Sequence, residues 1–173
     1  MSISSRFLWM AEILELNPDD RILEIGCGAG VAVEQIAMRL KGGSITAIDR
    51  SKPMISKAMI RNERFIQEKK AEFILTELAQ LPEGTRRYDK IFAFNVNLFW
   101  TKKYFSNETQ IIKSHLGGKG RLYLFYQPPD ASDAKRISNL VSKNLASHGF
   151  EVVETVYDKT VHSCCIVSRP SVK

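Results

Sequence analysis

Short apolar runs alternate with amphipathic segments along most of the chain. The runs are rich in Ile, Leu and Phe and lie at residues 21–25, 44–48, 72–75, 89–95 and 120–126. They do not alternate between apolar and polar positions, which is typical of strands buried on both faces of a parallel sheet. The pattern therefore predicts that these runs form the parallel part of one sheet.

The segments between the runs repeat apolar residues every three or four positions, which predicts helices. The clearest repeats lie within residues 7–14, 33–40, 54–66, 111–116 and 134–145. Start signals agree with three of them. Ser51 can cap a helix that has Pro53 in its first turn. Asn107 with Gln110 resembles a capping box, and Asp130 precedes the last long repeat.

The end of the chain follows a different pattern. Residues 150–170 hold two strand-like runs with no room for a helix between them, so we expect them to pair as an antiparallel hairpin. The whole order predicts an α/β fold, a doubly wound, mostly parallel seven-stranded sheet with helices on both faces and a C-terminal antiparallel hairpin. In such sheets ligands bind at the carboxyl ends of the strands, where residues 26–30 fall.

Composition adds limits to this picture. At 173 residues the chain is expected to be a single domain over 1–173, with a helix within 1–18 that packs on or caps the site. No apolar segment is long enough to span a membrane, and Arg6 and Glu12 interrupt the N-terminal segment, so a cytoplasmic protein is expected. Cys27, Cys164 and Cys165 have neither a disulfide pattern nor metal-ligand spacing, so no metal site is expected.

The net charge of +6 favours anionic partners in general terms. The basic residues are spread along the chain, however, and in the segment 61–70 they alternate with acids. We interpret this segment as a solvated helix face rather than a nucleic-acid footprint.

The stretch GCGAG at residues 26–30 is the main chemical signal. A dinucleotide loop has the pattern G-x-G-x-x-G, but Val31 stands where the third glycine would fall. A phosphate-binding loop needs a lysine and a hydroxyl that do not follow here. Glu24, just before the loop, favours a ligand that is partly cationic over a pyrophosphate.

These residues resemble the first motif of the class I (Rossmann-like) S-adenosylmethionine-dependent methyltransferases, and the resemblance covers nearly the whole chain. ITAIDRSKPMISKA is similar to the family's second strand, which ends in an acid. AEFILTELAQLP resembles the third strand with its adenine loop, and YDKIFAFNVNLFW and GGKGRLYLFY resemble the fourth and fifth strands. The resemblance implies an enzyme that binds S-adenosyl-L-methionine and releases S-adenosyl-L-homocysteine.

The resemblance also assigns cofactor-binding roles. Gly26, Cys27, Gly28 and Gly30 would bring the backbone against the methionyl part, and Glu24 would face its ammonium group.

Further residues would hold the rest of the cofactor. Asp49 would accept hydrogen bonds from both ribose hydroxyls, Glu77 and the backbone of Leu78 would contact adenine, and Asn95 would lie near the sulfonium. Two of these positions depart from the family pattern: Glu77 replaces the usual Asp, and Arg50 replaces an apolar residue and either covers adenine or is solvated.

The methyl acceptor is indicated less clearly. The sequence NVNLFW lacks the two prolines that mark nucleic-acid adenine methylases, and little chain remains for an acceptor domain, which favours a small molecule. Candidate acceptor contacts are Asn97, Phe99, Trp100 and Tyr104, with Phe7, Trp9, Phe105, Tyr126 and Gln127 as further candidates nearby. The aromatic residues could equally pack the N-terminal helix onto the sheet.

Three functions therefore remain open. The first is methyl transfer to a small molecule by in-line displacement, for which no catalytic base is assigned. The second is methyl transfer to RNA or protein, which a compact positive patch beside the glycine loop would favour. The third is a non-catalytic relative that binds the cofactor and serves as a partner subunit, with its acceptor pocket filled by its own side chains. The glycine spacing disfavours a nicotinamide dehydrogenase, and the oligomeric state is left open.

Overall fold

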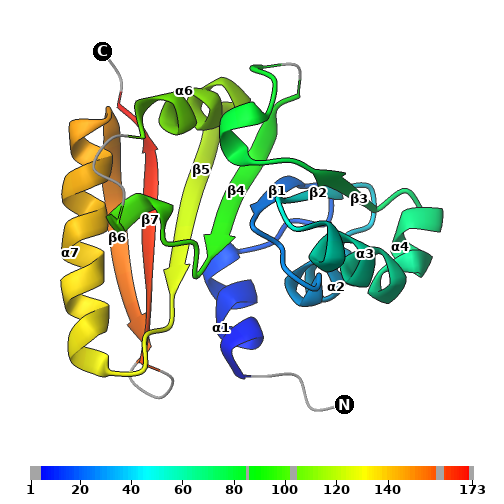
Figure 1. The fold of residues 1–173 in the computed structure, drawn as a ribbon, viewed down its shortest axis with the longest axis horizontal. Helices are drawn as coiled ribbons and strands as arrows, with labels where there is room; N and C mark the ends of the chain where they lie inside the picture. The colour runs from blue at the N-terminus through cyan, green and yellow to red at the C-terminus, as the bar shows by residue number, and fades with distance from the viewer. Residues whose placement is uncertain (1–4, 85, 102–104, 159–161, 172–173) are drawn as a thin grey trace.

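The chain forms a mixed sheet of seven strands in the order β3-β2-β1-β4-β5-β7-β6 (Figure 1). In this computed structural model the described residues are 5–84, 86–101, 105–158 and 162–171. The strands are β1 Arg21–Ile25, β2 Ser44–Asp49, β3 Ala71–Leu75, β4 Tyr88–Phe94, β5 Leu116–Tyr126, β6 Phe150–Asp158 and β7 Ser163–Pro170. The pairings from β3 to β5 are parallel, and β7 is antiparallel to both β5 and β6. The predicted fold class is confirmed.

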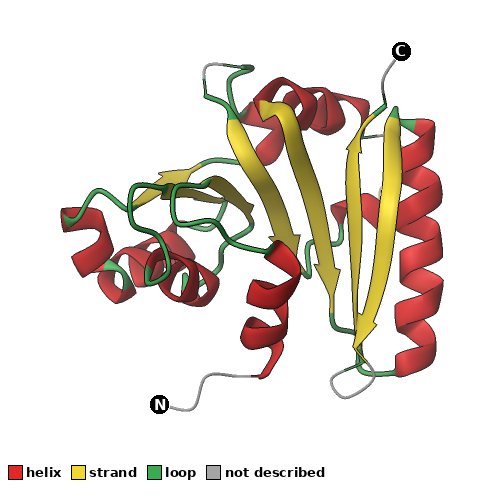
Figure 2. Ribbon diagram, turned by 180° about the vertical axis from the view of Figure 1, so that it is seen from behind, coloured by secondary structure: helices red, strands yellow, loops and turns green. Residues whose placement is uncertain are grey.

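Helices lie on both faces of the sheet (Figure 2). One face is covered by α1 Ser5–Leu14, α2 Val31–Ala37, α3 Lys52–Arg61 and α4 Glu63–Gln67. The other is covered by the 3₁₀ helix η1 Leu78–Gln80 and by α5 Leu98–Thr101, α6 Ser106–His115 and α7 Ala131–Ser147. Because the strand order reverses between β1 and β4, the loops after these two strands diverge and leave room for a ligand between them.

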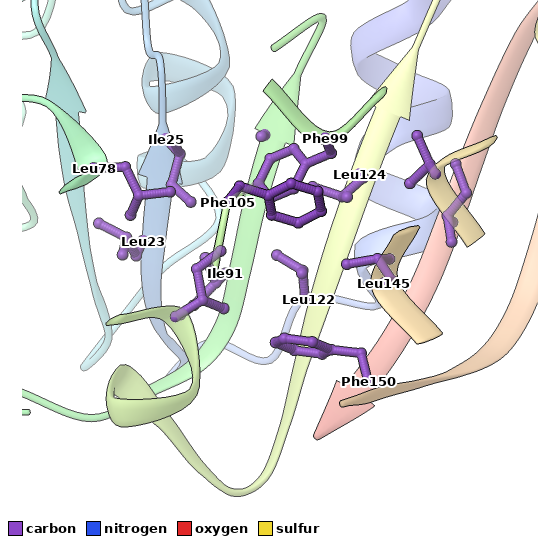
Figure 3. Close-up of a cluster of buried hydrophobic side chains, with 14 of the residues drawn as sticks. Leu23, Ile25, Leu78, Ile91, Phe99, Phe105, Leu122, Leu124, Leu145 and Phe150 are labelled. Carbon is purple, nitrogen blue, oxygen red and sulfur yellow. The ribbon is translucent and has the colours of Figure 1, made fainter. Parts of the chain in front are cut away.

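The core consists of two clusters of buried side chains, one on each face. The cluster shown in Figure 3 joins β1, β4 and β5 to α5, α6 and α7 through residues such as Leu23, Ile91, Leu122 and Leu145. The central strands β1, β2 and β4 are buried along most of their length, as the sequence pattern indicated. The expectation is wrong for β3, because it forms the edge of the sheet and exposes Glu72 and Leu75.

The N-terminal helix α1 packs on the second cluster. The ring of Phe7 lies 6.1 Å from that of Phe94, and the edge of Trp9 meets Phe125 at 5.6 Å between centroids. These contacts place Phe7 and Trp9 on the face of β4 and β5 that carries α1, where they pack the helix onto the sheet.

One of the three start signals is wrong. Ser51 and Asp130 occupy the N-cap positions of α3 and α7. The Asp130 carboxylate accepts a hydrogen bond from Ser132 N, whereas the Ser51 side chain makes no capping hydrogen bond. Helix α6 instead begins at Ser106, with Phe105 as its N-cap. The amide of Asn107 donates to Ala79 O at 3.2 Å, so this side chain holds η1 rather than capping its own helix.

Within the described residues, no helix combines the length and apolarity needed to cross a membrane. The same residues contain no cluster of three or more His, Cys, Asp or Glu side chains that could hold a metal ion.

Candidate functional site

The glycine loop follows β1 and is fixed to the end of β2. The amides of Gly26 and Cys27 both donate to Ile48 O, at 2.8 and 3.1 Å. Gly26, Gly28 and Gly30 all have positive φ, at 75°, 53° and 72°. L side chains rarely adopt this left-handed conformation, so the backbone alone explains why glycine stands at all three positions.

The three glycines nevertheless have different surroundings. A methyl group on Gly26 would lie 2.8 Å from Val96 Cγ2, and one on Gly30 would lie 2.6 Å from Asn62 Nδ2 and 2.8 Å from Ala58 Cβ. A methyl group on Gly28 would have no atom within 4 Å. Gly26 and Gly30 therefore allow close packing inside the protein, and Gly28 is the glycine that faces open space. The surroundings of Gly30 explain this glycine by helix packing rather than by cofactor contact.

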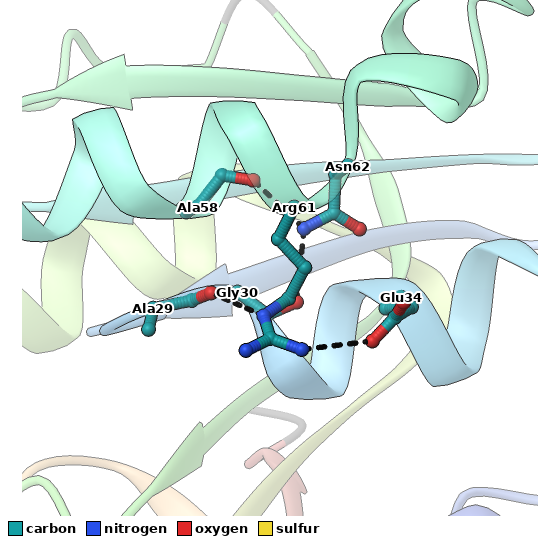
Figure 4. Close-up of polar contacts among 6 residues, drawn as sticks. All are labelled: Ala29, Gly30, Glu34, Ala58, Arg61 and Asn62. Atoms are coloured by element: carbon teal, nitrogen blue, oxygen red, sulfur yellow. Dashed lines mark hydrogen bonds and ion pairs between the residues drawn. The ribbon is translucent and has the colours of Figure 1, made fainter. Parts of the chain in front are cut away.

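A polar network holds the loop and α2 against the end of α3 (Figure 4). The buried Asn62 amide donates to Gly30 O at 3.0 Å. Arg61 donates to Ala29 O at 3.1 Å and pairs with Glu34 at 3.2 Å. The interpretation of residues 61–70 as a solvated helix face is wrong for Asn62, which is fully buried because folding brings it against the loop.

Asp49 ends β2 beside the loop, and two backbone amides fix its carboxylate. Gly28 N donates to Oδ2 at 2.8 Å, and Ser51 N donates to Oδ1 at 2.9 Å. A carboxylate oxygen can accept more than one hydrogen bond, so both oxygens keep acceptor capacity for hydroxyl groups. Asp49 is thus held in one orientation before any ligand arrives.

Glu24, on β1, is a buried acid with an unused oxygen. Only 2% of its surface is exposed, and its Oε2 has no hydrogen-bond partner among the described residues. Burial, together with the nearby Asp49 charge, raises the pKa of Glu24 to about 8. Buried polar atoms are normally paired. The unpaired buried oxygen fits a hydrogen-bond donor of a ligand, such as the methionyl ammonium that the motifs imply.

The raised pKa of Glu24 predicts a pH-dependent stability for the ligand-free protein. Between the ordinary pKa of 4.5 and about 8, the folded protein keeps a proton that the unfolded chain has lost. The free energy of unfolding therefore falls with rising pH, by up to about 1.4 kcal/mol per pH unit from this group. Urea unfolding across this range should show a smaller fall for Glu24→Gln than for the wild type. Equal slopes in the two proteins would contradict this account of Glu24.

The cysteines are buried and unreactive. Burial is the first cause that raises the pKa of the Cys27 thiol, and the Glu24 and Asp49 charges add to it. Burial likewise raises the pKa of Cys164 to about 11 and that of Cys165 well above its ordinary value. A thiol that stays protonated is a poor nucleophile, so Cys27 contributes its backbone to the loop rather than its sulfur.

A pocket of about 600 Å³ lies over the carboxyl ends of β1, β2 and β4. It brings together seven of the predicted site residues: Gly26, Asp49, Arg50, Glu77, Leu78, Asn95 and Asn97. Thr76 and Ala79 extend the lining at the Glu77 end, and Leu98, Thr101 and Glu108 extend it beyond Asn97. Thr101 and Glu108 could not be predicted as lining residues, since helical spacing alone does not show which face of a helix meets a pocket.

Asn95 forms the turn after β4 in an unusual conformation. Its φ is 56°, which Asn tolerates better than most residues. The backbone amide of Asn95 donates to Phe125 O at 2.8 Å, and its side-chain Oδ1 accepts from the backbone amide of Gln127 at 2.8 Å. These bonds hold Asn95 across the end of β5, and next to it Tyr126 donates its hydroxyl to Val96 O at 3.0 Å.

Two of the other predicted acceptor contacts, Phe99 and Trp100, do not line this pocket. Phe99 is fully buried and packs edge-on against Phe105, with the ring centroids 5.8 Å apart. Trp100 lies beneath the Arg136 guanidinium of α7, at 5.8 Å. The reason is helical geometry, because α5 presents Leu98 and Thr101, three residues apart, to the pocket and turns Phe99 inward. Tyr104 lies outside the described residues.

The charges around the pocket do not form a positive patch. Among its described lining residues Arg50 is the one base, against Asp49, Glu77 and Glu108. The described residues that line the pocket therefore do not form the compact basic surface that would favour an RNA acceptor.

Comparison with known proteins identifies the family. Residues 22–116, more than half of the chain, match the model of a methyltransferase domain. The chain belongs to this family, the class I S-adenosylmethionine-dependent methyltransferases, as its motifs implied. S-adenosylmethionine is accordingly the cofactor. The unpaired Glu24 oxygen and the open space beside Gly28 are compatible with a ligand at the loop, although Glu24, Cys27, Gly28 and Gly30 are not among the residues that line the pocket.

Two relatives come from Bacillus subtilis. The uncharacterized methyltransferase YdaC is 26% identical over an alignment that covers 94% of this chain and 91% of YdaC. The putative methyltransferase YrhH is 29% identical over 86 residues, which span 50% of this chain and about half (47%) of YrhH.

A solved structure with the same fold is magnesium protoporphyrin IX methyltransferase from Synechocystis with bound S-adenosylmethionine. It superimposes with a TM-score of 0.67 at 20% identity and covers 96% of this chain and 77% of that protein.

Proposed function

We propose that the protein transfers a methyl group from S-adenosylmethionine to a small-molecule acceptor. One observation carries this proposal: the pocket continues past the predicted cofactor residues to Asn97, Leu98, Thr101 and Glu108. The volume of about 600 Å³ includes the part that the cofactor would occupy, so the proposal depends on the additional lining residues and not on the volume. The Synechocystis neighbour, named for a magnesium porphyrin, is consistent with a small acceptor.

One set of lining residues would bind the cofactor, and another would bind the methyl acceptor. Asp49 would hold the ribose hydroxyls, Glu77 and the backbone of Leu78 would contact adenine, and Asn95 would lie near the methionyl group. Asn97 and Thr101 would present polar groups to the acceptor.

When bound, the cofactor supplies a reactive methyl group on its sulfonium. The protein therefore needs only to hold the acceptor in line with that group and to exclude water.

The extra lining residues of the pocket also argue against the alternative of a non-catalytic partner subunit. A partner subunit without activity was expected to fill its acceptor space with its own side chains. Among the described residues, the lining continues to α5 and α6 around open volume, which favours an active enzyme.

Two measurements test the proposed function in order. Calorimetric titration of the full chain should show binding of S-adenosylhomocysteine and much weaker binding of NAD, since the loop lacks the dinucleotide spacing. The protein is then incubated with methyl-tritiated cofactor and a cell extract separated into small-molecule, RNA and protein fractions. We expect the label in the small-molecule fraction. Label in RNA or protein would overturn the choice of acceptor, and tighter binding of NAD would overturn the cofactor.

A further inference from the structure

A second groove lies at the opposite edge of the sheet from the cofactor pocket. Most crossovers between the parallel strands carry an α-helix, but the described part of the β3–β4 connection carries only the short η1. A groove of about 540 Å³ lies at the amino ends of β1, β2, β3 and β4. The first residues of these strands, Arg21, Ser44, Ala71 and Tyr88, are among those that line it. With strands of five or six residues, it lies roughly 17–20 Å from the cofactor end.

The groove is strongly basic. Arg21, Lys69, Arg86 and Arg87 line it, and Glu72 is its one acid among the described residues. Glu72 forms an ion pair with Arg86. None of the ion pairs among the described residues includes Arg21, Lys69 or Arg87. Arg87 donates to Leu116 O at 3.2 Å, which leaves its charge uncompensated.

Lys69 holds one of these charges at a position where glycine is the usual residue. It follows α4 with a φ of 57°. The amides of Lys69 and Lys70 donate to Ile66 O and Phe65 O, at 3.0 and 2.8 Å, which is the Schellman arrangement at a helix end. Glycine adopts this left-handed conformation without strain, whereas lysine does not. The chain thus keeps a cation beside the groove at a conformational cost.

The other lining groups suit the same kind of ligand. Ser44, Thr46 and Tyr88 bring hydroxyl-bearing side chains to the groove. Guanidinium groups bind the oxygens of phosphate groups with paired, charge-assisted hydrogen bonds, and an ammonium group binds them as a point charge. The Asp89 carboxylate lies beside Arg21, where it accepts a hydrogen bond from the Arg21 backbone amide at 2.8 Å. The cations of the groove still outnumber the acids near it, and together with the hydroxyl groups they match an anionic, phosphorylated ligand better than an apolar one.

We propose that this groove binds the phosphate groups of a nucleotide or of a nucleic-acid strand. The site is separate from the methyl-transfer pocket, so the proposal does not depend on which acceptor the enzyme uses. Both sources present the same chemistry to the groove, and the experiment below distinguishes them.

The test compares two double variants of equal net charge. The groove variant is Lys69→Gly with Arg21→Gln, and the control is Lys57→Gln with Lys143→Gln, whose lysines are exposed on α3 and α7. Lys69→Gly relieves the left-handed strain, so the groove variant should melt no lower than the wild type. A loss of binding then cannot be attributed to unfolding. The probes are 5′-uridine monophosphate, by calorimetry, and a fluorescein-labelled decauridylate, by anisotropy.

We expect the groove variant to bind both probes at least tenfold more weakly than the control, while its affinity for S-adenosylhomocysteine is unchanged. The plot of log K against log salt for decauridylate should lose a slope of about 1.4, since each phosphate contact on a single strand contributes about 0.7. A decauridylate affinity at least tenfold above that of the nucleotide identifies a nucleic-acid strand as the ligand, and equal affinities identify a nucleotide. Equal losses in the two double variants, or no binding of either probe to the wild type, would overturn the site.

Discussion

Replacing Gly28 with alanine should weaken binding of S-adenosylhomocysteine by about 10- to 100-fold, because an added methyl group in a filled site costs ~1–3 kcal/mol. The methyl group meets no protein atom within 4 Å, so in the ligand-free protein it enters only open space. The protein should still fold, with the free energy of unfolding lowered by about 1–2 kcal/mol by the left-handed φ of 53°. Calorimetric titration measures the affinity, and urea unfolding measures the stability.

Gly84 provides the matched control. Its φ is 66°, and a methyl group there would make only ordinary contacts, the nearest at 3.6 Å, with Ser114 on α6. Gly84→Ala should therefore lose similar stability and no affinity. If Gly28→Ala bound the ligand as well as Gly84→Ala does, the loop would not be in contact with the cofactor.

Asp49→Ala should weaken the same binding by about 10-fold or more, since hydrogen bonds to a charged group contribute ~1.5–3 kcal/mol. Two effects combine in this variant. The ribose hydroxyls lose their acceptor, and the amides of Gly28 and Ser51 lose the carboxylate that they now bind at 2.8 and 2.9 Å. The loop would thus lose both a ligand contact and part of its internal support.

Asp89→Ala is the control for Asp49→Ala, because it also removes a carboxylate that binds a backbone amide but lies outside the cofactor pocket. Asp89 also accepts a hydrogen bond from a backbone amide, that of Arg21 at 2.8 Å, and it does not line the cofactor pocket. The affinity of Asp89→Ala should match that of the wild type. Unchanged affinity in Asp49→Ala, measured by calorimetry, would remove Asp49 from the site.

The sheet could be predicted because burial on both faces leaves a local trace in the sequence. The central parallel strands are mostly apolar runs, and the last two strands are joined too closely to be parallel. The start of α6 could not be predicted in the same way. Asn107 has the chemistry of a cap, but it bonds instead to Ala79, which is distant in sequence.

The site was predictable where the chemistry lies in one stretch of chain. The glycine loop, Asp49 and Glu77 each lie in a short motif that can be recognised in the sequence. The structure brings Asp49 and Glu77 to one pocket. The direction of each side chain depends on packing that the sequence does not show. Phe99 turns into the core, and Gly30 serves the contact with Asn62.

The hydrogen bond from Gly28 to Asp49 links the two parts of the surface that would receive the cofactor. The carboxylate that would take the sugar also restrains the backbone that would take the amino-acid part. The two halves of the ligand would therefore contact parts of the protein that one hydrogen bond already joins. A ligand that joins both halves gains from this linkage, and the spent cofactor, which keeps both, would dissociate as one unit rather than in stages.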